Sequence, residues 1–322
     1  MRFSLISLYL HILIFSQAAS ATSVLPNLKV VLTNDDGWAV AQIRSEYNAL
    51  HEAGFNASPL RSLSFTCVLM SAPAVNKSGT GNSTAVPSVL TTPCEFDTCP
   101  VGSPAVGFNA TDRNLNYVNA FPVDAVTYGI QALAPKLFQS PPDLVISGSN
   151  VGNNLGSVIT GSATVRAAAA GSLLGFPSIA FSGATAAQIS YTTLESDPTS
   201  KFSLAAATYN NLTLTFLQKY LSNLENPILP PGVTINVNYP GTENCPTASS
   251  ISWIFTRIAA PSEGTRDVES CGKTQLTDEL TTIRLGCYAT ISVFNATTIQ
   301  DVSADKQEFV LKKLQGLLSC LP

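Results

Sequence analysis

The sequence predicts an α/β fold with a mainly parallel sheet and helices on both of its faces. Apolar runs alternate along the chain with segments whose apolar residues have helical spacing. These runs do not alternate with polar residues, which is typical of strands buried on both faces of a parallel sheet. Three of them end in loops rich in Asp, Asn, Ser and Gly, and open sheets of this kind bind ligands beyond the carboxyl ends of their strands.

The individual elements follow from turn signals and periodicity. In the first helical segment Ile43, Tyr47 and Leu50 share one face, and Gly54 marks its end. The predicted strands lie within residues 28–37, 65–73, 142–148, 176–183, 232–241 and 249–259. The predicted helices lie within residues 41–54, 123–138, 163–175, 201–221 and 305–319. Residues 94–104 indicate a surface excursion, and residues 183–201 indicate a loop.

Composition limits the kinds of protein that the chain can be. Its 322 residues are 45% hydrophobic and 12% charged, which is ample material for a core. The net charge is -4 and no Lys/Arg cluster is present, which argues against a nucleic acid as the main partner. There is no internal repeat and no strong linker, so we expect residues 22–322 to form a single domain.

The N-terminus has the pattern of a secretory signal. One Arg precedes an apolar run from Leu5 to Phe15, and small residues end in Ala-Ser-Ala at Ala21. The alternative, a membrane anchor, is disfavoured because the run is too short to span a bilayer and no later segment is long and apolar enough. We therefore predict a signal peptide over residues 1–21, a secreted protein, and no membrane partner.

Cysteines and glycosylation sequons agree with secretion. An oxidising compartment favours disulfides, but seven Cys cannot all pair. Cys67 lies in an apolar run and is the predicted free thiol, whereas Cys94 and Cys99 are predicted to pair across a tight loop. Two more bonds of open connectivity are expected among Cys245, Cys271, Cys287 and Cys320. Sequons begin at Asn56, Asn76, Asn82, Asn109, Asn211 and Asn295.

Two adjacent carboxylates, Asp35 and Asp36, follow the first predicted strand in the segment VVLTNDDGWAV. One interpretation is a turn, because Asn, Asp and Gly are common turn residues. The other is a site for a hard divalent cation, to which Ser78 and Asn150 would add neutral oxygens from neighbouring strand ends. The glycines of the same loops leave backbone N–H groups free to face an anion: Gly79, Gly81, Gly148 and Gly152.

The scarcity of histidine excludes several kinds of catalytic site. The chain contains only His11 and His51, and His11 would leave with the signal peptide. A Ser-His-Asp hydrolase would depend on His51, and no G-x-S-x-G motif is present. A His-rich zinc site is impossible for the same reason. Carboxylate and oxygen-ligand metal chemistry remains, and metal-assisted hydrolysis of a phosphate ester fits it best.

At this stage the chain resembles the SurE (survival protein E) family. The segments that carry the resemblance are VVLTNDDGWAV, VLMSAPAVNKSGTGNST, PDLVISGSNVGNNLG, GSATVRAAAAGSLLGFPSIAFS and VTINVNYP, between Lys29 and Ala259. The family's fold is a three-layer, Rossmann-like sheet with a C-terminal β/α extension that builds dimers or tetramers. Its members are metal-dependent nucleotidases and phosphatases, and secreted fungal relatives are often called acid phosphatases.

The resemblance also implies a set of site residues. The family's metal ligands correspond to Asp35, Asp36, Ser78 and Asn150, of which the two aspartates are also the expected catalytic residues. Positions lining the family's phosphate pocket correspond to Asn34, Gly79, Asn154, Ser162 and Thr164. The implied cofactor is Mg²⁺ or Mn²⁺. The loop from Cys94 to Cys99 and the stretch of residues 185–200 look like additions to the family pattern.

We therefore expect a metal-dependent phosphomonoester hydrolase that acts on nucleoside monophosphates or related small phosphate esters. Homodimers or homotetramers are expected from the resemblance. The alternative is a secreted, non-catalytic ligand-binding protein that retains the fold. Such a protein need not keep all four metal ligands, and their presence favours the enzyme.

Overall fold

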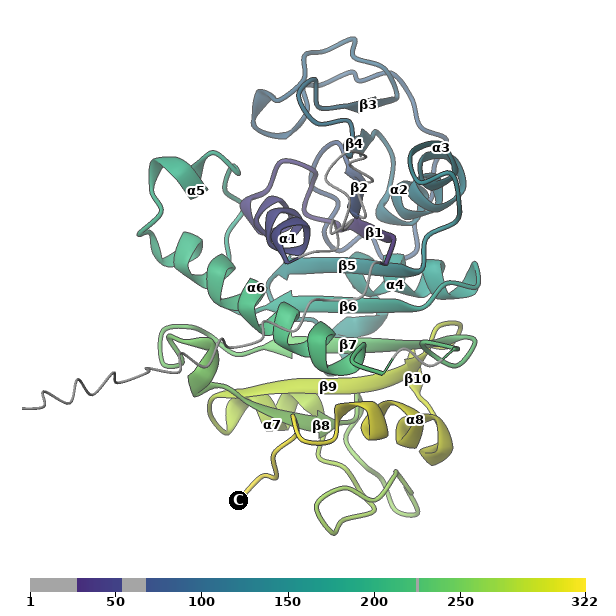
Figure 1. The fold of residues 1–322 in the computed structure, drawn as a ribbon, viewed down its shortest axis with the longest axis vertical. Coiled ribbons are helices and arrows are strands. Elements are labelled where there is room, and N and C mark those ends of the chain that lie inside the picture. Colours follow the sequence, from purple (N-terminus) through teal and green to yellow (C-terminus); the bar gives the residue numbers. More distant parts are fainter. Residues whose placement is uncertain (1–27, 54–67, 224–225) are drawn as a thin grey trace, which may run out of the picture.

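The structure is a computed structural model that describes residues 28–53, 68–223 and 226–322 (Figure 1). The predicted signal peptide, the sequon at Asn56 and the predicted free thiol Cys67 lie outside the described residues. None of the described helices combines the length and the apolar character that a membrane span requires.

Ten strands form a single sheet in the order β10-β9-β7-β6-β5-β1-β2-β4-β3, and β8 pairs with β9 off this path. The pairs from β4 to β7 are parallel, whereas β3, β9 and β10 pair antiparallel at the two sides. The mainly parallel sheet predicted from the sequence is therefore confirmed. The strand bounds are Val30–Thr33 (β1), Val68–Pro73 (β2), Val106–Phe108 (β3), Leu115–Val118 (β4), Leu144–Val151 (β5), Ser178–Gly183 (β6), Val233–Tyr239 (β7), Ser252–Thr256 (β8), Tyr288–Asn295 (β9) and Gln300–Asp301 (β10).

Helices cover both faces of the sheet. On one face α1 packs against α6, and on the other α2 packs against α4 (Figure 1). A π-helical turn at Gly129–Leu133 joins α2 to α3, so the predicted single helix over residues 123–138 is one continuous but irregular helix. The helix bounds are Ala41–Glu52 (α1), Pro122–Tyr128 (α2), Ala134–Leu137 (α3), Ala163–Leu173 (α4), Thr193–Ser196 (α5), Lys201–Tyr220 (α6), Glu279–Arg284 (α7) and Ala304–Leu314 (α8).

The central strand β1 shows why three layers form. Its side chains point alternately to opposite faces, and all are fully buried. Leu32 belongs to the apolar cluster that includes Ile43 of α1 and Phe216 of α6. Val31 belongs to a separate cluster with Val126 of α2. A strand that is buried at every position therefore requires cover on both sides, as the apolar run predicted.

The Ala-rich helix α4 lies very close to the sheet. A methyl group on Gly171 would lie 2.7 Å from Oγ of Ser178 and 3.1 Å from a methyl carbon of Val145. Small side chains along α4 permit this approach, which fixes the position of the helix N-terminus relative to the strand ends.

Three disulfides are present among the described residues. Cys94 pairs with Cys99, which confirms the predicted bond. The remaining four cysteines form the pairs Cys245–Cys287 and Cys271–Cys320, a connectivity that the sequence left open. Both of these bonds lie in the C-terminal part of the chain, next to β8 and β9.

Candidate active site at the carboxyl ends of the strands

The three polar loops predicted from the sequence meet at one edge of the sheet. Strand β1 lies between β2 and β5, and Leu32 is in register with both Met70 and Ile146. The carboxyl ends of the three strands are therefore neighbours. Their loops are also joined directly, because the backbone N–H of Lys77 donates to the carbonyl of Asp35 at 2.7 Å.

The turn after β1 is shaped by Asn34. The side-chain Nδ2 of Asn34 donates to the carbonyl of Gly37 at 3.0 Å, and the Gly37 N–H donates to Asn34 Oδ1 at 3.3 Å. Gly37 has a φ of 115°, which a residue without a side chain adopts readily. The Asn34 amide thus stabilises this turn. The turn directs Asp35 and Asp36 into the interior, where they are 3% and 0% exposed.

Asp36 accepts hydrogen bonds from three separate segments: the loop after β2, the end of β5 and the segment of residues 185–200. Ser78 Oγ donates to its Oδ1 at 3.1 Å, the N–H of Val151 donates to its Oδ2 at 2.8 Å, and Gln188 Nε2 donates to its Oδ1 at 2.5 Å. All three donors are neutral, so the negative charge of Asp36 has no positive partner in this set.

Thr164 connects Asp35 to Asn150. Its hydroxyl lies 2.6 Å from Asp35 Oδ1 and 3.0 Å from Asn150 Oδ1. A hydroxyl has one proton, so it donates to only one of these oxygens at a time. The Asn150 amide is held from its other side, because Nδ2 donates to the Gly152 carbonyl at 2.7 Å. The structure therefore brings together all four predicted metal ligands: Asp35, Asp36, Ser78 and Asn150.

Electrostatics make this pair of carboxylates unfavourable when both are charged. Burial raises the pKa of Asp35, and burial together with the charge of Asp35 raises the pKa of Asp36 to about 7. Among the described residues no three His, Cys, Asp or Glu side chains converge closely enough to hold a metal ion. A cation at this position would therefore take its other protein ligands from neutral oxygens, as Ser78 and Asn150 provide.

The predicted phosphate-pocket residues have different surroundings. Ser162 is the N-cap of α4, where its Oγ accepts from the N–H of Val165 at 3.1 Å. Asn154 is buried, and its Nδ2 donates to Ser182 Oγ at 2.9 Å. Gly79 is exposed and has a φ of 73°. The side chains of Asn34, Asn154 and Ser162 thus make internal hydrogen bonds, whereas the Gly79 loop is exposed and the positive end of α4 faces the aspartate pair.

Glu279 in α7 organises the loop that follows β5. Its Oε1 accepts from the N–H of Gly156 at 2.9 Å, and its Oε2 accepts from Asn236 Nδ2 at 3.0 Å. Asn236 and Asn238 of β7 both donate to the carbonyl of Asn154 at 3.0 Å. Burial raises the pKa of Glu279 to about 8. The C-terminal part of the chain therefore fixes the loop that follows β5, the strand that carries the predicted metal ligand Asn150.

Two other residues at the site were missed by the sequence analysis. Gln188, which donates to Asp36, lies in the segment of residues 185–200. Glu95 lies in the Cys94–Cys99 loop, and burial together with the charge of Asp36 raises its pKa to about 8. Both segments look like additions to the family pattern, and this was the one sign in the sequence that they could contribute to the site. The sequence did not indicate which of their side chains face the site.

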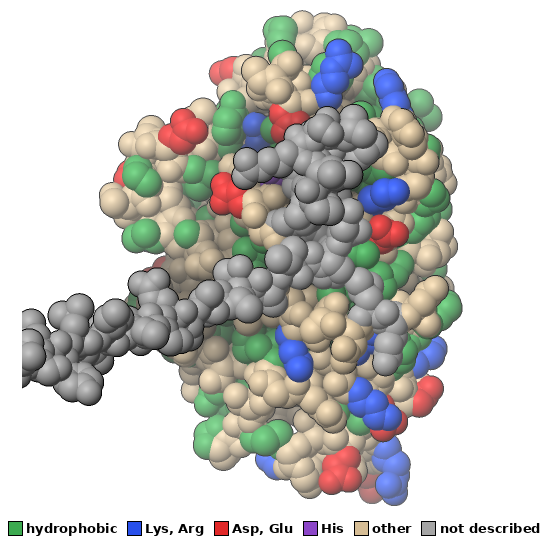
Figure 2. Space-filling model, viewed as in Figure 1, with side chains coloured by type: hydrophobic (Ala, Val, Ile, Leu, Met, Phe, Trp, Pro, Cys, Tyr) green, Lys and Arg blue, Asp and Glu red, His purple; other side chains and the backbone are tan. Residues whose placement is uncertain are grey.

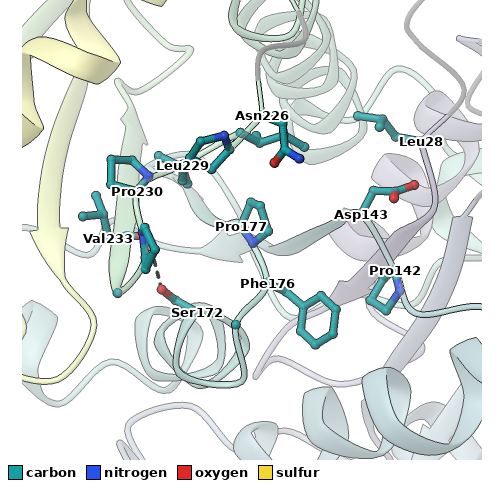
Figure 3. Close-up of a pocket in the computed structure, with 15 residues that line it drawn as sticks. Leu28, Pro142, Asp143, Ser172, Phe176, Pro177, Asn226, Leu229, Pro230 and Val233 are labelled. Atoms are coloured by element: carbon teal, nitrogen blue, oxygen red, sulfur yellow. Dashed lines mark hydrogen bonds between the residues drawn. The ribbon is translucent and has the colours of Figure 1, made fainter.

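A hollow of about 430 Å³ lies at the opposite edge, where β5, β6 and β7 begin (Figure 3). Prolines and apolar side chains dominate its lining, including Pro177 and Leu229. Asp143 is its one titratable lining residue, and its carboxylate accepts from the N–H of Lys29 at 2.8 Å. Ser172 likewise donates to the carbonyl of Val233 at 3.2 Å. The Asp143 carboxylate and the Ser172 hydroxyl are thus engaged, and the hollow has no pair of carboxylates like that at the other edge.

The molecular surface agrees with a small-molecule site. On the face shown in Figure 2, Lys and Arg side chains are scattered among Asp and Glu and form no continuous basic patch over the described residues. A surface of this kind offers no extended track for a polyanion.

Comparisons with known proteins agree with this geometry. The family profile described as Survival protein SurE matches residues 30–263. The chain is 34% identical over 235 residues to an acid phosphatase of Yarrowia lipolytica, covering 70% of this chain and 61% of that protein. It is 35% identical over 213 residues to the 5'-nucleotidase SurE of Lawsonia intracellularis, covering 66% of each. These alignments span somewhat less than two thirds of the length of either relative.

A solved structure shares the fold. The crystal structure of SurE protein from Aquifex aeolicus matches with a TM-score of 0.53 and 24% sequence identity. The match covers 89% of this chain and 99% of the other. The family profile ends at residue 263, so α7, with Glu279, lies beyond it.

Proposed function

The chain belongs to the SurE family, and from this premise we propose that it is a divalent-cation-dependent hydrolase of small phosphate monoesters, nucleoside monophosphates among them. The observation that carries the proposal is the buried pair Asp35 and Asp36, adjacent carboxylates whose hydrogen-bond donors are all neutral. The proposal includes secretion after removal of residues 1–21.

The donor set fits a hard divalent cation. Two carboxylates with a hydroxyl and an amide oxygen are the ligand types that Mg²⁺ and Mn²⁺ prefer. Asp35, Asp36, Ser78 and Asn150 would hold the ion, and its charge would relieve the repulsion that raises the pKa of Asp36. When bound, such an ion neutralises charge on the phosphoryl group and lowers the pKa of water.

The chain's own residues bind and orient the phosphate. The N-terminus of α4 carries backbone N–H groups and the positive end of an eleven-residue helix, and both favour an anion there. Ser162 fixes the first turn of this helix, and Thr164 ties it to Asp35. The phosphate site and the carboxylate pair are therefore held in one rigid arrangement, which keeps the electrostatic stabilisation of the transition state preorganised.

Proton transfer at this site depends on carboxyl groups. His51 lies in the last turn of α1, roughly 15 Å along the helix axis from the end that follows the aspartate turn. Its ring lies near Tyr47, with centroids 6.1 Å apart. Asp35 and Asp36 are the titratable groups placed to hold or move a proton beside the phosphate.

The test is hydrolysis by the purified protein of p-nitrophenyl phosphate and of nucleoside monophosphates, with Mg²⁺ or Mn²⁺ added. We expect phosphate release that requires the cation. Binding of Mn²⁺ without hydrolysis of any of these esters would contradict the proposal and favour the alternative of a non-catalytic binding protein. Sedimentation of the same sample tests the expected homodimer or homotetramer.

A further inference from the structure

The Cys94–Cys99 loop is attached to both loops that carry the aspartate pair and Ser78. The indole N–H of Trp38, two residues after Asp36, donates to Thr98 Oγ1 at 3.0 Å. The backbone N–H of Glu95 donates to the carbonyl of Ala74, directly after β2, at 3.0 Å. The loop is thus fixed against the site at two points in addition to its own disulfide.

Glu95 directs its carboxyl group into this junction. A methyl group on Gly37 would collide with Glu95 Oε2, and it would lie 3.4 Å from the backbone N of Asn76. The carboxyl group therefore lies against the residue that follows Asp36, close to the loop that leads to Ser78.

Glu95 is partly buried, and one oxygen of its carboxyl group has no hydrogen-bond donor. Glu95 Oε2 is inaccessible to solvent and accepts no hydrogen bond from the described residues. No Lys, Arg or His of the described part of the chain forms a salt bridge with it. A buried carboxylate oxygen without a donor or counter-charge is costly, so its presence calls for a partner that enters the site.

We propose that Glu95 is a further residue of the cation site, where its negative charge increases the affinity for a divalent cation without coordinating it directly. The absence of a three-carboxylate cluster among the described residues argues against direct coordination. Charge acts over several ångströms in a buried site, so a carboxylate at Glu95 attracts a cation beside Asp36. The inference rests on the proposed cation site and adds a residue from the disulfide loop to it.

The test compares Glu95→Gln with the matched control Asp97→Asn. Both changes remove one carboxylate from the same loop, but Asp97 is exposed. Mn²⁺ binding to each purified protein is measured by titration calorimetry at fixed pH, and thermal unfolding without metal verifies folding. We expect Glu95→Gln to weaken Mn²⁺ binding about tenfold or more, and Asp97→Asn to bind as the wild type does. Glu95→Ala provides a second variant with the same expectation.

The outcomes separate this inference from the proposed function. Wild-type affinity in both Glu95 variants would overturn the role of Glu95 while leaving the cation site intact. Equal weakening in Asp97→Asn would also overturn it, because the effect would then come from the general charge of the loop. A wild-type protein that binds no Mn²⁺ would contradict the proposed cation site itself.

Discussion

Two of the regions that bury carboxylates, the aspartate pair after β1 and Glu279 of α7, do so in different ways. Glu279 is fully buried, and its two oxygens accept hydrogen bonds from Gly156 and Asn236. Asp35 and Asp36 are equally buried, but each has a second negative charge as its neighbour. Burial raises the pKa in both regions.

The two regions differ in whether their carboxylates need a further partner. A protonated or hydrogen-bonded Glu279 needs no further partner, and its contacts explain how it fixes the loop after β5. The aspartate pair remains repulsive in spite of its donors, because neutral hydrogen bonds do not remove like charges from one site. Burial of a carboxylate is therefore weak evidence for chemistry, whereas burial of two carboxylates of which one raises the pKa of the other is stronger evidence.

The largest expected effect concerns Asp36→Asn. The change removes one of two charges that would hold the cation, so we expect initial rates of phosphate-ester hydrolysis to fall by a factor of about 10² or more. Stability without metal should be kept or rise slightly, because the repulsion with Asp35 is removed. The measurements are initial rates against Mg²⁺ or Mn²⁺ concentration and thermal unfolding in EDTA.

The turn interpretation predicts a different result for the same variant. Asn forms turns as well as Asp does, so activity and metal response would stay near those of the wild type. Such a result would place the aspartate pair in the same class as Glu279, as a structural feature only.

Truncation of Glu279 should lower the stability of the protein and leave its affinity for the cation nearly unchanged, the opposite of Asp36→Asn. Glu279→Ala leaves the Gly156 N–H and one Asn236 donor without their acceptor, which we expect to lower the free energy of unfolding by roughly 2–4 kcal/mol. Denaturant unfolding measures this loss, and Glu279→Gln serves as the milder control. Mn²⁺ affinity should change far less than in Asp36→Asn. A loss of affinity as large as in that variant would mean that the two regions do not differ as described.

The pH dependence of stability follows from the raised pKa values. Burial raises the pKa of Glu46 to about 7 and that of Glu279 to about 8, both above the value near 4.5 of the unfolded chain. The folded protein then binds more protons, so this contribution is fully present below pH 4.5 and is lost as the pH rises through 7 to 8.

We therefore expect stability without metal to fall by on the order of a few kcal/mol between pH 5 and pH 8.5. Chemical unfolding in EDTA across this range measures the slope, and Glu279→Gln should reduce it. A stability that increases with pH over this range would show that these carboxyl groups are ionised in the folded protein.

The smallest effect is expected from the Cys94–Cys99 bond. This bond closes a short ring beside the aspartate pair, whereas the loop held by Glu279 relies on hydrogen bonds. Replacing both cysteines by Ser should cost about 2 kcal/mol or less, because a short ring removes little entropy from the unfolded chain. Peptide mapping without reduction checks the bond in the wild type. Alkylation of either Cys as a free thiol would contradict it.

Much of the fold was predictable from local patterns. The uninterrupted apolar runs of β1, β2, β5 and β6 correctly predicted a parallel sheet covered on both faces, and the family resemblance was confirmed. The strand β9 was missed although six of its eight residues are fully or almost fully buried. Its role depends on antiparallel pairing with β7, and pairing between distant segments leaves no local signal.

The site was predicted only where its residues are adjacent to strand ends. Asp35 and Asp36 lie just after β1, Ser78 lies in the loop after β2, and Asn150 is the penultimate residue of β5. Gln188, Glu95 and Glu279 reach the same edge from additions or from the C-terminal part, and a single Glu or Gln is an ordinary surface residue in sequence. Asn34 was assigned to the phosphate pocket, whereas the structure shows its amide engaged with Gly37.

The central claim, a catalytic cation held by Asp35 and Asp36, is tested most directly by removing divalent metal from the wild-type protein. Hydrolysis of p-nitrophenyl phosphate is measured before and after excess EDTA, and again after Mn²⁺ or Mg²⁺ is restored. We expect activity to be lost in EDTA and to return with the cation, while the protein remains folded throughout. Full activity in excess EDTA would contradict it and would leave the two carboxylates as part of a turn.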